Sequence, residues 1–172
     1  MENVDTLVAL GLAEFPDVLE KLADQMMLEE PRDIEFLRRR KLDTGREFAV
    51  WEYTVGYCMN ASDILSLLRA QATDASAPTD LSTLKESARR VCDWYAGSFK
   101  VTGAMDDAVT ILSHCRDLYA EVDSIEQFAS LTRATERYLV QLLFWVDRQL
   151  PWPAVSDLVH GYRLRTADGP TR

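Results

Sequence analysis

The sequence predicts an all-α protein, a single-domain helical bundle of about six to eight helices, two of them long and largely buried. Apolar residues recur at steps of three and four along almost every segment of the 172 residues, which is the period of an α-helix. Few runs alternate with the period of two that a strand requires. A chain of this length buries about 70% of its unfolded surface in one core. We therefore expect one domain over residues 1–165 and a flexible tail at 166–172.

Three short helices are expected before residue 44. Apolar stripes over residues 4–15 and 18–27 predict the first two, and the first should end near Gly11 or Pro16. Pro31 suits the first turn of a third helix that holds Ile34, because proline lacks an amide hydrogen that the first turn does not use.

A long central helix is predicted over residues 44–71. Thr44 and Glu47 form a capping-box pattern at its start. The segment 48–59, FAVWEYTVGYCM, is apolar or aromatic nearly all round. A helix of this kind has to be covered on every side, by the rest of a bundle or by a partner. The small, polar residues 72–80 then predict a surface loop.

Two amphipathic helices should follow the loop. Residues 81–99 carry a clean apolar stripe, and residues 101–103 predict a turn. Over residues 105–122 the apolar positions step by three and four, as in the seam of a helical bundle.

The second long helix is predicted over residues 124–150. Ser124 and Gln127 indicate its start, and two prolines end it. Its segment YLVQLLFWV is apolar except for Gln141. A last short helix is expected over residues 154–164.

Charge and cysteine content restrict the compartment and the partners. A net charge of −9 weighs against a nucleic-acid binder, whose affinity comes from basic side chains on phosphates. Cys58, Cys92 and Cys115 are odd in number, widely spaced and each on an apolar stripe, so we expect buried, unpaired thiols in a reducing cytoplasm. No run approaches the roughly 18 apolar residues of a membrane span.

Motifs for metal, cofactor and nucleotide chemistry are missing from the sequence. The chain has two histidines without metal-ligand spacing and no glycine-rich phosphate loop. We therefore assign no catalytic residue, no metal and no cofactor.

Glu52 is the first candidate for a functional residue, because its helical neighbours offer no cation and suggest partial burial. The favoured interpretation is a structural partner from another helix, for which Arg137, Arg116 and Gln141 are candidates. The alternative is a carboxyl group with a raised pKa in a binding site.

Gly56 costs about 1 kcal/mol inside a helix, so a close helix crossing, or a ligand against the backbone, is expected beside it. Tyr53 and Tyr57, four residues apart, could line such a site, although core packing is the commoner role of such a pair. The candidate ligand-binding set, between the two long helices, is Glu52, Tyr53, Tyr57, Gln141 and Trp145.

Two further features are candidates for binding a partner. Arg38, Arg39 and Arg40 belong to the main basic cluster, for which a solvated helix end is the simpler interpretation. Trp152 lies between two prolines and is either an interface anchor or a plug between helices.

The function predicted from these observations is a non-catalytic, cytoplasmic protein-interaction module: an adaptor, an inhibitor or a small subunit, which binds a protein partner or self-associates as a homodimer. One alternative is a small-molecule-binding protein or cofactor-independent enzyme with a pocket between the long helices. Another is a helical chaperone that binds a client peptide.

Overall fold

A computed structural model describes residues 4–28, 44–77, 79–102 and 105–149. It confirms the all-α bundle, with six helices and no strand among these residues. The helices are α1 (Val4–Val8), α2 (Phe15–Leu28), α4 (Thr44–Thr73), α5 (Leu81–Thr102), α6 (Asp106–Glu121) and α7 (Ile125–Gln149). The third predicted helix, the last short helix and the tail at 166–172 lie outside the described residues.

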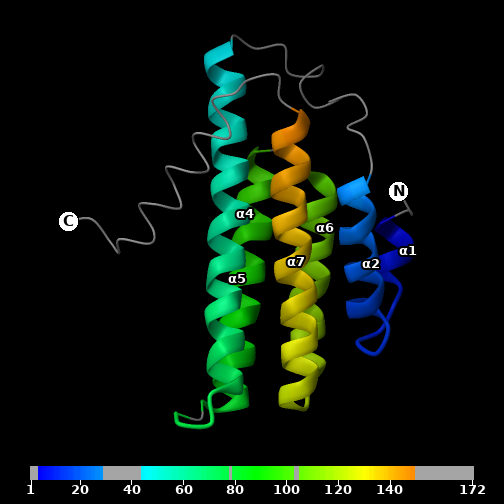
Figure 1. The fold of residues 1–172 in the computed structure, drawn as a ribbon, viewed down its shortest axis with the longest axis vertical. Helices are drawn as coiled ribbons and strands as arrows, with labels where there is room; N and C mark the ends of the chain where they lie inside the picture. Colours follow the sequence, from blue (N-terminus) through cyan, green and yellow to red (C-terminus); the bar gives the residue numbers. More distant parts are fainter. Residues whose placement is uncertain (1–3, 29–43, 78, 103–104, 150–172) are drawn as a thin grey trace, which may run out of the picture.

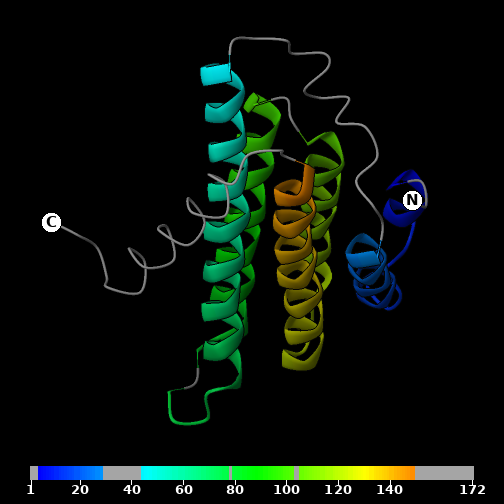
Figure 2. The same ribbon diagram turned by 45° about the horizontal axis from the view of Figure 1, so that its top comes forward.

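Four helices form an up-and-down bundle. In Figures 1 and 2, α4 and α6 run in one direction and α5 and α7 in the other. α4 packs against both α7 and α5, and α6 packs against α5. α2 lies against α7 on the side away from α4, and α1 contacts the outside of α6.

Local signals explain the starts of α2 and α7. Pro16 does not end a helix but lies in the first turn of α2, where its missing amide hydrogen costs nothing. At the start of α7, Ser124 Oγ accepts a hydrogen bond of 3.1 Å from the Gln127 amide, and Gln127 Oε1 accepts one of 2.9 Å from the Asp123 amide. The predicted cap is therefore confirmed.

The core runs the length of the bundle, with polar contacts inside it and at its edge. The Tyr119 and Thr132 hydroxyl groups lie 2.7 Å apart between α6 and α7. Lys85 Nζ donates to the carbonyl oxygens of Ala120 and Val122, near the end of α6. The largest fully buried apolar side chains include Phe15, Leu19, Leu65, Leu84, Phe99, Ile111, Leu112, Phe128 and Leu131.

The two long predicted helices have close to the predicted bounds, since α4 covers residues 44–73 and α7 covers 125–149. The described chain does not itself cover the central helix on every side, because Glu52 and Tyr53 are exposed; coverage by a partner stays a prediction. α4 has one apolar row in the core and a second row on its surface.

Candidate functional site

The largest exposed apolar side chains of α4 and α5 lie on adjoining flanks of these two helices, and we call them the α4/α5 stripe. Its members, with their exposed fractions, are Tyr53 (59%), Ile64 (38%), Leu67 (65%), Trp94 (72%) and Val101 (86%). Extended apolar patches on a soluble chain mark interaction surfaces. The stripe is therefore our candidate site.

The α4 part of the stripe has the spacing of a helix-packing seam. Tyr53, Tyr57, Asn60, Ile64 and Leu67 follow one another at steps of four, three, four and three, so they form one straight row on α4. The core row of α4 is separate and contains Val55, Cys58 and Leu65. Two rows on opposite sides explain why the sequence of this helix is apolar nearly all round.

The row on α4 borders α5. The half-buried ring of Tyr57 packs edge-on against Phe99, with ring centroids 5.6 Å apart, and lies 6.2 Å from Tyr95. On its other side the same ring stacks on Tyr53 at 6.3 Å. The exposed Tyr53 is therefore the outer end of an aromatic chain that begins in the core.

Trp94 and Val101 lie on the flank of α5 that is turned toward α4. The opposite flank binds α6, through Lys85 to the Val122 carbonyl and through Asp93 to Arg116 at 2.8 Å. Because each residue advances about 100° around a helix, Trp94 projects away from that flank.

The register of the two antiparallel helices makes the stripe continuous. Tyr57 lies between the levels of Tyr95 and Phe99. One turn toward the N-terminus of α4, Tyr53 reaches the level of Val101. One turn toward the C-terminus of α4, Asn60 reaches the level of Trp94. Trp94 is thus at the level of Asn60, the one polar position of the α4 row.

Two helix-interior glycines border the stripe and face open space. A Cβ atom added at Gly56 or Gly97 would meet no heavy atom within 4 Å. The close helix crossing predicted at Gly56 is therefore wrong for the described chain. A glycine costs about 1 kcal/mol relative to alanine in a helix. No contact among the described residues explains why glycine occupies either position.

The two helices that carry the stripe do not share the net negative charge of the chain. α4 and α5 together contain five acidic and six basic residues, a balance of +1. The net charge of the whole chain is −9, so the residues outside α4 and α5 carry a net charge of −10.

Glu52 does not have the predicted environment, because it is exposed on α4. Two of its proposed partners are engaged elsewhere: Arg137 binds Asp24 and Glu20 of α2, and Arg116 binds Asp93 and Asp117. The surface row makes the sequence of α4 apolar on nearly all sides, and this pattern is the reason for the expected burial of Glu52.

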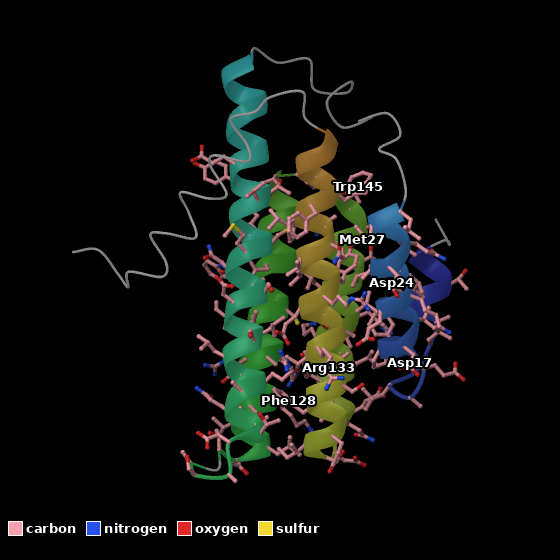
Figure 3. The ribbon with its side chains drawn as sticks, in the orientation of Figure 1. Asp17, Asp24, Met27, Phe128, Arg133 and Trp145 are labelled. Atoms are coloured by element: carbon pink, nitrogen blue, oxygen red, sulfur yellow. The ribbon has the colours of Figure 1, made fainter. Side chains whose placement is uncertain are left out.

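The five predicted ligand-binding residues do not meet in one pocket between the long helices. Tyr53 and Tyr57 are together, but on the flank of α4 that faces α5. Gln141 and Trp145 follow Arg137 at steps of four on α7, and Arg137 binds α2. Their face of α7 is therefore turned toward α2, where Figure 3 shows Asp24 and Met27.

Gln141 keeps one feature that a binding site would need. Its Oε1 atom is buried and has no hydrogen-bond partner in the part of the chain that the structure describes. A buried acceptor without a donor is destabilising unless water or a ligand supplies one.

The cysteines and potential metal ligands offer no reactive centre. Cys58, Cys92 and Cys115 are free and buried, as predicted, and burial raises the pKa of each thiol above its usual value. Within residues 4–28, 44–77, 79–102 and 105–149, no three His, Cys, Asp or Glu side chains gather closely enough to hold a metal ion. None of the described helices has the length and apolar character of a membrane span.

The two partner-binding candidates of the sequence, Arg38 to Arg40 and Trp152, lie outside the described residues. Comparison with protein-family models, curated proteins and solved structures finds no match. The functional argument therefore depends on the geometry of this chain.

Sequence reasoning missed Trp94 and Val101. A signal was present, because the two residues lie seven apart on the polar side of an otherwise clean amphipathic helix. Their connection to Tyr53 needed the register between α4 and α5, which a single sequence does not contain.

Proposed function

We propose that the protein is a non-catalytic interaction module that binds a helical protein surface through the α4/α5 stripe. The observation that supports this most directly is the row at steps of three and four on α4, exposed at Tyr53, Ile64 and Leu67. In bundles and coiled coils, residues at this spacing form the seam that contacts a neighbouring helix. An adaptor, an inhibitor and a small subunit all use a surface of this kind.

A reducing compartment such as the cytoplasm suits this proposal. All three cysteines are free and buried, and proteins of oxidising compartments commonly pair theirs.

The test is a quantitative affinity purification from the native host with three forms of the full chain. Wild-type protein should retain a stoichiometric protein, which is either a second copy or another chain. A Leu67→Glu/Trp94→Glu variant should lose it, because both side chains then carry charge into an apolar contact. Phe144→Glu is the matched control, since Phe144 is 43% exposed on α7 and outside the stripe.

Circular dichroism should show the same helix content for all three forms. Retention of the same partner by the double variant, or the absence of any stoichiometric protein with the wild type, would contradict the proposal. A chaperone function predicts instead a broad set of substoichiometric clients that is lost in the double variant.

A small-molecule site is the second candidate, and the unpartnered Oε1 of Gln141 is the observation that favours it. A ligand at this position would donate a hydrogen bond from the α2 side of α7. Thermal-shift screening of wild type against Gln141→Leu identifies such a ligand if it raises the melting temperature of the wild type alone.

A further inference from the structure

We propose that the partner of the α4/α5 stripe is a second copy of this chain, packed about a two-fold axis that crosses α5 between Trp94 and Gly97. This inference rests on the proposed interaction function and names the occupant of the same surface. Four helices, α4 and α5 of each copy, would form the layer between the two cores.

The area of the stripe supplies about three quarters of what a stable dimer requires. At about 150–250 Å² for each large side chain, the exposed fractions of the five members give roughly 600 Å² per copy. A stable interface buries about 800 Å² on each partner. Tyr57 and the stems of neighbouring polar residues supply the rest.

The surface is complementary to itself, as a two-fold interface has to be. Trp94 projects from α5 with 72% of its surface exposed, and Gly97, one turn later on the same face, leaves a gap. A two-fold axis between these residues places each indole over the Gly97 of the other copy. The second copy then gives Gly97 the contact that the described chain lacks.

The distribution of charge selects this side of the molecule for self-association. Two copies with a net charge of −9 each repel one another. Contact through α4 and α5 joins two helices whose charges sum to +1, whereas the rest of each chain carries −10. A foreign partner would not need a neutral face, because a basic surface would bind the acidic sides better.

Sedimentation of the full chain at micromolar concentration tests the dimer. Wild type should sediment with twice the mass of one 19.6 kDa chain. Trp94→Glu should weaken the dimer at least about 30-fold, as expected for a central aromatic hot spot. Phe144→Glu adds the same charge to an exposed aromatic position on α7 and should leave the dimer unchanged.

The Gly97→Ala variant tests whether Gly97 has a role in the dimer interface or only within the single chain. The added methyl group meets nothing within one chain and favours the helix, so the melting temperature of the dilute monomer should rise. In the dimer it fills the gap beneath the indole, so the dissociation constant should rise about tenfold or more. A more stable monomer with unchanged dimerisation would overturn the proposed axis.

Cross-linking locates the axis without altering Trp94. The native thiols are buried, so Gly97→Cys introduces the one reactive thiol of the described chain. A short bismaleimide should join two Gly97→Cys chains and should leave Ser130→Cys chains, altered at an exposed position of α7, unlinked. Absence of the Gly97→Cys product at a concentration where wild type is dimeric would overturn the geometry.

Failure of this inference differs from failure of the proposed function. A monomeric wild type overturns the homodimer, including the case in which residues 150–172 of the same chain occupy the stripe. If that monomer binds another protein and loses it on Trp94→Glu, the interaction function stands. A dimer that survives Trp94→Glu and Leu67→Glu together overturns the homodimer at the stripe, and it overturns the proposed function as well if no other stoichiometric protein is lost in the double variant.

Discussion

Arg69 of α4 and Glu136 of α7 form a two-pronged ion pair between the two longest described helices. Arg69 Nε lies 2.6 Å from Glu136 Oε2, and Nη2 lies 3.2 Å from Oε1. The Glu136 side chain is only 11% exposed and that of Arg69 is 35% exposed. This planar contact aligns α4 with α7, because a two-pronged bond tolerates little sliding of one helix along the other.

Loss of Arg69 should therefore cost more than loss of both partners. Arg69→Leu leaves the Glu136 carboxylate mostly buried without its cation, and we expect the free energy of unfolding to fall by about 2–4 kcal/mol. Arg69→Leu/Glu136→Leu should lose less, because no stranded charge remains. Urea denaturation of the two variants and wild type measures the difference, and a double variant at least as unstable as Arg69→Leu would contradict this account.

Gln141→Leu should stabilise the protein. The substitution removes the buried Oε1 atom that has no partner in the described chain and replaces it with apolar surface, so a gain of about 1–2 kcal/mol in unfolding free energy is expected. Gln141→Glu is the contrasting variant and should destabilise, since it places a charge at the same position. A stability loss with leucine would indicate that water or another group satisfies the amide.

The three thiols should react slowly with Ellman's reagent in the native protein. Each is buried, and burial raises the pKa of Cys115 to about 12, so almost no thiolate is present near neutral pH. Denaturant should expose three rapidly reacting thiols per chain. A fast native phase, absent after Cys58→Ala or Cys115→Ala, would show that the thiol concerned is accessible and would reopen a nucleophile role for it.

Stability should decline in alkali, and Cys115 should contribute to the slope. The folded protein holds the thiol proton until about pH 12, whereas the unfolded chain releases it near the ordinary value of 9.0. The contribution is complete below about pH 9 and is lost as the pH rises from 9 to 12, because unfolding then releases a proton. Cys115→Ala should flatten the fall by up to about 1.4 kcal/mol per pH unit. Parallel curves for the two proteins would contradict this.

The sequence was sufficient for the described helices because their signals are local. Pro16, the Ser124 and Gln127 cap, and apolar steps of three and four each act within one or two turns. The burial of the cysteines followed from the same periodicity. Of the two predicted ends of the first helix, the one near Gly11 agrees with the non-helical residues 9–14, whereas Pro16 lies in the first turn of α2.

The candidate site could not be predicted in the same way, because it depends on which helices are neighbours. An apolar row on α4 looks alike whether α7, α5 or a second molecule covers it. Glu52 and Gly56 were misjudged for this reason, and Gln141 was assigned to the α4 side of α7 although its face is turned toward α2.

The exposure of Glu52 leads to a last prediction, which contrasts it with Tyr57 five residues later. Glu52 is exposed, so Glu52→Gln and Glu52→Leu should each change the unfolding free energy by no more than about 0.5 kcal/mol. The half-buried ring of Tyr57 contacts Phe99 and Tyr95, so Tyr57→Ala should cost about 2–3 kcal/mol, below the range for a fully buried aromatic side chain. Thermal and urea unfolding of the dilute protein measure all three. A large loss with Glu52→Leu that glutamine does not share would show that the carboxyl group accepts a hydrogen bond within the chain, and would contradict its exposed position on α4.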